Sequence, residues 1–92
     1  KDNTWGSNFV SISQDSGVVV RWGRLKVTDS IPEILGNVTI NSQNLICFDA
    51  VWFSDFGIII VDCTVKSTFG LQNRFIYVNT TSQTIMPLQI DN

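Results

Sequence analysis

The sequence predicts an all-β protein, a small antiparallel β-sandwich of about six to eight strands. Val, Ile and Thr, which favour strands, make up 29 of the 92 residues. Ala, Leu, Glu, Lys and Met, which favour helices, make up only 11. Stretches of alternating apolar and polar residues recur along the chain, with turn-forming residues between them. We expect one sandwich domain over residues 1–92.

Three strands are predicted in the first half, over residues 8–13, 18–22 and 38–40. A turn at residues 15–17 separates the first two strands. After Gly23 the apolar positions change parity, so we expect a bulge or a bend there that lets the strand change the face it presents. Residues 28–37 contain a proline and a glycine and are predicted as a crossing connection rather than a strand.

Four strands are predicted in the second half, over residues 45–53, 57–65, 75–78 and 85–90. Alternation in the first of them puts Ile46, Phe48, Ala50 and Trp52 on one face and Leu45, Cys47, Val51 and Phe53 on the other. Residues 57–65 begin apolar on both faces, which is typical of a central, doubly buried strand. Pro87 cannot donate to a ladder and marks an edge or a bulge.

The composition excludes several function classes. The chain contains no histidine, so it cannot build a Ser-His-Asp or Cys-His relay. Six Lys and Arg against eight Asp and Glu make a nucleic-acid partner unexpected. The longest apolar run, residues 58–61, is too short to insert across a membrane. Without a phosphate loop, a CxxC pair or a metal-ligand cluster, we expect no cofactor, no metal and no enzyme activity.

The charged residues in and beside the predicted strands are interpreted as structural rather than catalytic. Asp49 and Asp62 stand among apolar residues and could be taken for a glycosidase carboxylate pair. An ion pair between Asp62 and Arg21 or Arg24 is the expected alternative, because a buried carboxylate needs a partner. The basic stripe of Arg21, Arg24 and Lys26 is interpreted as the solvated side of a half-buried strand.

The two cysteines leave the cellular compartment open. Cys47 and Cys63 could form one bridge or remain two buried thiols. Asn37 and Asn79 begin glycosylation triplets. Such triplets arise by chance in a chain rich in Asn, Ser and Thr, and they do not decide whether the protein is secreted.

Residues 15–25, DSGVVVRWGRL, resemble the element that opens the C-terminal domain of many tailed-bacteriophage tail fibres. That element has a glycine, a short aliphatic strand and a Trp-Gly pair, matched here by Gly17, Trp22 and Gly23. Residues 38–40, 45–48 and 74–78 follow in a similar order and spacing. On this resemblance, residues 15–92 form the core of a fibre-tip domain, and residues 1–14 are a strand or a connection to an upstream shaft.

The resemblance implies a homotrimer at the tip of a virion's tail fibre, made in the host cytoplasm. The tip would recognise a bacterial surface glycan or an outer-membrane protein during host adsorption, without chemistry of its own. A physical argument points the same way, because a domain this small gains stability by burying apolar surface between copies. Trp5, Trp52, Phe53 and Phe56 are more large aromatic residues than one small core readily hides.

Two segments are candidates for receptor binding. The first supplies aromatic rings beside a carboxylate, equipment suited to sugar rings, in Trp52, Phe53, Asp55 and Phe56. The second is the predicted loop over residues 66–74, with Lys66, Phe69, Gln72, Asn73 and Arg74. Each segment also has a plain structural interpretation, the first as a hairpin packed inward or on a neighbour and the second as a solvated loop.

Two other functions stay open. One is a secreted adhesion module, lectin-like or immunoglobulin-like, with a Cys47–Cys63 disulfide and glycans on Asn37 and Asn79. The other is a structural trimerisation cap of a fibre that binds no receptor.

Overall fold

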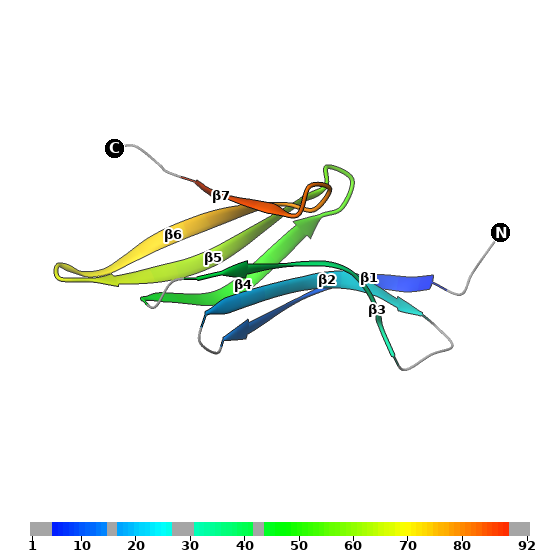
Figure 1. The fold of residues 1–92 in the computed structure, drawn as a ribbon, viewed down its shortest axis with the longest axis horizontal. Helices are drawn as coiled ribbons and strands as arrows, with labels where there is room; N and C mark the ends of the chain where they lie inside the picture. Colours follow the sequence, from blue (N-terminus) through cyan, green and yellow to red (C-terminus); the bar gives the residue numbers. More distant parts are fainter. Residues whose placement is uncertain (1–4, 15–16, 27–30, 42–43, 89–92) are drawn as a thin grey trace.

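The computed structural model describes residues 5–14, 17–26, 31–41 and 44–88 and confirms the all-β fold. These residues form two antiparallel sheets packed face to face (Figure 1). Sheet A has the order β1-β2-β3, formed by β1 (Trp5–Gln14), β2 (Val18–Lys26) and β3 (Glu33–Ile40). Sheet B has the order β4-β5-β6-β7, formed by β4 (Leu45–Phe53), β5 (Ile58–Ser67), β6 (Gly70–Asn79) and β7 (Thr84–Leu88).

The core lies between the two sheets. Sheet A contributes Val18, Val20, Trp22, Val38 and Ile40, and sheet B contributes Leu45, Cys47, Ile59, Val61, Cys63, Ile76 and Val78. In β3, and in β5 as far as Cys63, the buried positions alternate with residues that point away from the core, as the two-residue period of a strand requires. Among the described residues, no helix is long and apolar enough to cross a membrane.

Three glycines allow the strands to pack closely around the Trp22-Gly23 element. Gly36 pairs with Trp22, and a Cβ atom at Gly36 would stand 2.5 Å from Cζ2 of the indole. A Cβ atom at Gly23 would collide with the carbonyl oxygen of Glu33. At Gly17 the corresponding distance to the carbonyl oxygen of Ile40 is 2.8 Å. Glycine is therefore required at these positions by space, which gives the element a structural role.

The irregularity expected at Gly23 is present, but the extra residue lies on the neighbouring strand. The register of β2 and β3 shifts between Trp22 and Gly23, and Leu35 of β3 is the residue left over. The pairing of β2 with β1 is continuous through this point. The expected change of face within β2 is therefore wrong, and Leu25 stays exposed instead of joining the core.

Two predicted connections are instead strands. β3 begins at Glu33, so residues 33–37 belong to sheet A; Gly36 does not end the strand, because it provides room for the indole of Trp22. Residues 66–74 are not a long loop: β5 and β6 continue to a turn at Thr68 and Phe69, followed by Gly70 at φ 110°. Residues 1–4, 15–16, 28–30 and 89–90 of the predicted segments lie outside the described residues, as do the side chains of Trp5 and Lys26.

β4 has the predicted bounds but a different arrangement of faces. Its register with β5 passes from Cys47 opposite Cys63 to Asp49 opposite Asp62, which leaves Phe48 as a bulge. The bulge resets the alternation, so the inner positions before it continue as Ala50 and Trp52 after it. The predicted grouping of Val51 and Phe53 with Leu45 and Cys47 is therefore wrong.

Candidate interaction surface

The outer face of sheet A, turned away from the core, is largely polar. The registers of its strands place five polar residues on that face, Ser11, Ser13, Arg21, Asn37 and Thr39, together with the apolar Phe9 and Val19. Arg21 donates from Nη1 to Oγ of Ser13 at 3.4 Å. This is the usual arrangement for an antiparallel sheet with one face on the core and one in water, and it agrees with the interpretation of Arg21 as a solvated residue.

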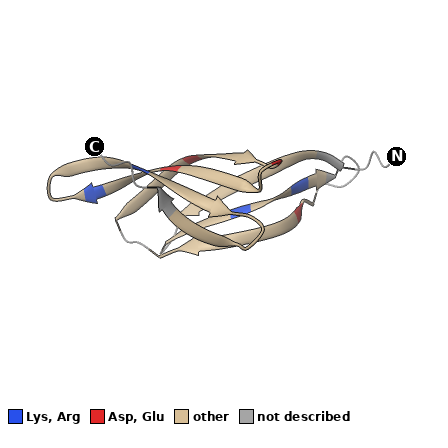
Figure 2. Cartoon of the chain, turned by 90° about the horizontal axis from the view of Figure 1, so that it is seen from above, with Lys and Arg blue, Asp and Glu red and all other residues tan. Residues whose placement is uncertain are grey.

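The outer face of sheet B is largely apolar. The registers place Ile46, Val51, Phe53, Ile58, Ile60, Leu71, Phe75, Tyr77 and Met86 there. Several of these side chains are well exposed, Leu71 at 70% and Met86 at 62%. Charged residues are few along the described strands (Figure 2). Sheet B is therefore apolar on both sides, and only one of those sides is covered by sheet A.

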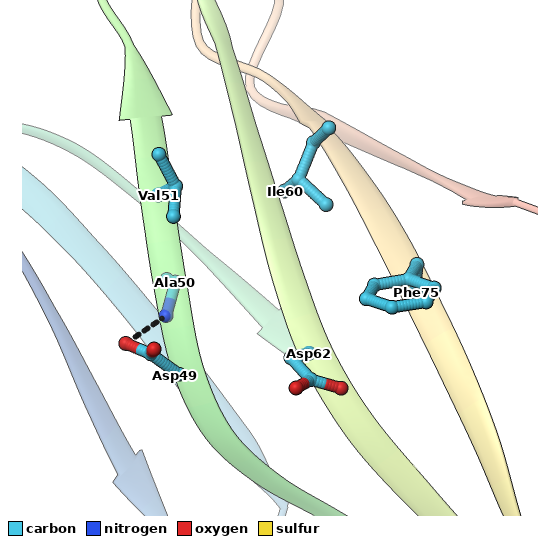
Figure 3. A pocket seen from close by; sticks show the side chains of 6 residues that line it. All are labelled: Asp49, Ala50, Val51, Ile60, Asp62 and Phe75. Carbon is cyan, nitrogen blue, oxygen red and sulfur yellow. Dashed lines mark hydrogen bonds between the residues drawn. The ribbon is translucent and has the colours of Figure 1, made fainter.

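A shallow hollow of about 190 Å³ lies on this outer face, lined by Asp49, Ala50, Val51, Ile60, Asp62 and Phe75 (Figure 3). Asp49 and Asp62 are direct cross-strand partners, and both are exposed. Oδ1 of Asp49 accepts a hydrogen bond from the Ala50 N–H at 2.9 Å. Like charges directly opposite each other destabilise a sheet. Two neighbouring carboxylates among apolar side chains are therefore the unusual feature of this face.

The expected burial of Asp62 with an arginine partner is wrong. Asp62 lies on the outer face of sheet B, whereas Arg21 and Arg24 belong to β2 in sheet A. Exposure to water, rather than an arginine, solvates the Asp62 carboxylate. The described residues contain no group of three or more His, Cys, Asp and Glu side chains that could hold a metal ion.

The first predicted binding segment is divided by the fold. Trp52 points inward against the core, and its buried Nε1 has no hydrogen-bond partner among the described residues. Phe53 lies on the outer face, and the next residues form the β4–β5 turn, where Phe56 is 76% exposed. The turn is held by the Phe56 N–H, which donates to the Phe53 carbonyl at 3.0 Å. Phe53, Asp55 and Phe56 remain accessible at this end of sheet B.

The second predicted segment is the tip of the β5–β6 hairpin. Phe69 is 94% exposed, and Lys66, Gln72 and Asn73 are exposed beside it, while Arg74 is half-buried. The Phe69 N–H donates to Oγ of Ser67 at 3.3 Å, and that hydroxyl donates to the Gly70 carbonyl at 2.9 Å. The structure does not bring the two predicted segments together, because they lie at opposite ends of β5, roughly 30 Å apart for a strand of this length.

The structure forms a disulfide between Cys47 and Cys63, with an S–S distance of 2.10 Å. The two residues are opposite each other on β4 and β5 and point inward, so the bridge lies in the core. The sequence alone allowed either a bridge or two buried thiols. The register of β4 and β5 brings the two cysteines together.

The two glycosylation triplets lie close to each other. Asn37 is exposed on β3, and its backbone N–H donates to Oε1 of Gln83 at 3.5 Å. Asn79 begins the β6–β7 turn that contains Gln83, and its Oδ1 accepts the N–H groups of Thr81 and Ser82 at 3.0 and 3.1 Å. Asn37 is thus exposed at the surface, and Asn79 is half-buried.

No family model, curated protein or solved structure matches this chain. The outer face of sheet B is the feature that sequence reasoning missed. Two signals pointed to it: Ile58 and Ile60 are apolar at positions that alternate with the buried Ile59 and Val61, and Val51 and Phe53 are apolar on the parity opposite Trp52.

Proposed function

We propose that this chain is a non-catalytic recognition module that associates through the outer face of sheet B. The observation that carries the proposal is the contrast between the two outer faces, polar on sheet A and apolar on sheet B. Contiguous apolar surface of this kind marks interaction sites in soluble proteins. Its residues come from all four strands of sheet B, so the surface is broad rather than a pocket for a small molecule.

Substitution of matched valines tests the proposal. Val51→Thr changes the outer face of sheet B, and Val19→Thr is the control on the outer face of sheet A. We expect Val51→Thr to weaken association about tenfold, since one apolar side chain loses its burial, and Val19→Thr to leave it unchanged. Light scattering over a range of protein concentrations measures the association. A wild-type mass that stays at 10.3 kDa at every concentration contradicts the proposal.

The resemblance of residues 15–25 supports one setting for this module, the receptor-binding tip of a bacteriophage tail fibre. In that setting three copies associate, and the tip binds a bacterial surface glycan or outer-membrane protein on a virion. Phe56 with Asp55 at one end of sheet B, and Phe69 with Lys66 at the other, are the exposed groups suited to contact a receptor.

A specific observation favours a second setting, a secreted adhesion module. The Cys47–Cys63 bridge is of a kind that forms and persists in oxidising compartments. Asn37 and Asn79 are placed where attached glycans do not meet the core. The two settings share the associating face and differ in disulfide, glycans and number of copies, all of which are measurable.

A further inference from the structure

We propose that the outer face of sheet B binds the same face of a second copy of this chain, about a two-fold axis that crosses the strands at Thr64. The inference rests on the proposed association, narrows it to two copies in one register, and stands in place of the three-copy arrangement. The charges and the exposed apolar side chains of the face are complementary to those of a second copy.

The outer face is built of rows that run across the strands. One row contains Asp49, Asp62 and Phe75, the next contains Ile46, Thr64 and Asn73, and the third contains Lys66 and Leu71. Neighbouring rows are about 6.8 Å apart, because outward residues recur every second position. The acidic row and the lysine row therefore lie at equal distances on either side of the Thr64 row.

A two-fold axis in the interface at Thr64 exchanges these two rows between the copies. Lys66 of one copy then faces Asp62 of the other, because both belong to β5. By the same operation Leu71 faces Phe75, both of β6. The acidic pair that destabilises the isolated sheet thus gains an ammonium partner, and Leu71, which is 70% exposed, gains an aromatic contact.

The same register places the tip of the β5–β6 hairpin against the partner copy. Phe69 lies beyond the lysine row, so the axis brings it over the hollow between the Asp62 and Ile60 rows of the other copy. The hollow is smaller than the 300–1,000 Å³ typical of small-molecule sites, and its 190 Å³ suits one inserted side chain. Phe69 is 94% exposed in the single chain, and insertion of its ring would bury apolar surface on both partners.

Other arrangements of the same face leave the carboxylates without a cation. An axis moved to the Asp62 row brings the Asp49 and Asp62 pairs of two copies together. Three copies that turn this face toward a common axis along the strands bring three such pairs to one height. An axis level with Val61, midway between the Asp62 and Ile60 rows, presses the carboxylates against Val51 and Ile60 of the partner, which costs desolvation. The register at Thr64 avoids all of these.

Charge reversal tests the register. We expect Asp62→Lys and Lys66→Asp each to raise the dimer dissociation constant at least about tenfold, and the double variant to restore it to within about threefold. Within one chain the two residues are about 13 Å apart along β5, so recovery reports a contact between chains. Sedimentation equilibrium gives the constants, and circular dichroism with urea unfolding checks the fold of each variant.

Phe69→Ser and Phe56→Ser provide a second test, which remains valid even when the charge-reversal variants do not fold. Both residues are in exposed turns, at opposite ends of β5. We expect Phe69→Ser to dissociate the dimer and Phe56→Ser to leave it intact, because the register places only Phe69 against the partner. Equal effects of the two substitutions would overturn the register.

The outcomes separate this inference from the proposal on which it rests. A wild-type protein that stays monomeric overturns both. A trimer, or a dimer that the double charge variant fails to restore, leaves association standing and overturns the two-fold register. A dimer lost in each single charge variant and recovered in the double variant supports both.

Discussion

The contact between Gly36 and Trp22 makes the strongest prediction for a single residue. We expect Gly36→Ala to lower the free energy of unfolding by about 1–3 kcal/mol, because the added methyl group meets the indole at 2.5 Å and either the ring or the strand must move. Urea unfolding followed by Trp fluorescence measures it. Thr39→Ser, an exposed change on the same strand, serves as the control and should stay within about 0.5 kcal/mol. An unchanged midpoint for Gly36→Ala would mean that the indole has room to shift.

At this scale the sequence identified important residues more readily than their roles. Trp22 and Gly23 stood out as a motif, and the structure gives each a packing role. The bulge at Phe48 could not be located, because the residues around it are apolar on both parities and alternation carries no phase there. Asp49 and Asp62 stood out as charged residues among apolar ones, but their pairing across the strands depends on that same bulge.

The bridge between β4 and β5 makes a prediction at the scale of the element. Replacing both cysteines, Cys47→Ala with Cys63→Ala, should lower the free energy of unfolding by about 3 kcal/mol, since the bridge closes a loop of 16 residues. Urea unfolding of the variant against the oxidised wild type measures the loss. The wild type unfolded in the presence of reductant is the control and should approach the variant. Coincident curves for all three samples would show that the bridge does not restrain the unfolded chain.

Elements were predicted well where the pattern had one clear period and poorly where glycine and proline were taken as breaks. The bounds of β4 were predicted correctly from its ends, Leu45 and Phe53. The start of β3 was missed because a glycine in a strand is usually unfavourable, and only the ring of Trp22 on the adjacent strand explains Gly36. The β5–β6 hairpin was read as a loop because its outward residues, Lys66, Gln72 and Asn73 among them, are polar and its turn lacks an Asn-Gly or Asp-Gly signal.

The whole molecule exposes more surface than a compact monomer of its mass. Its radius of gyration is 14.8 Å, where about 12 Å is expected for 92 residues. Its accessible surface is 6535 Å², against about 5,400 Å² expected at 10.3 kDa. The excess is comparable to the 800 Å² or so that each partner buries in a standard interface. A chain of this shape thus has surface enough for an interface of standard size.

Intact mass under non-reducing conditions decides between the two settings at this scale. The secreted module predicts a chain lighter by two hydrogens, from the Cys47–Cys63 bridge, and carrying added hexose at Asn37 and Asn79 when produced by a secreting eukaryotic cell. The fibre tip predicts no hexose and a trimer. The same purified sample should be sized by light scattering, and a trimer without hexose would contradict the secreted module.

Both borders of sheet B are unsuited to the addition of further strands. On β4 the bulge at Phe48 interrupts the ladder, and on β7 Pro87 has no N–H to offer. Strand-by-strand growth into fibrils is therefore obstructed, even though the sheet is rich in residues that favour it. The proposed pairing through the outer face of sheet B would instead cover its exposed apolar side chains. The interrupted edges of sheet B and its exposed apolar outer face thus favour association face to face over association edge to edge.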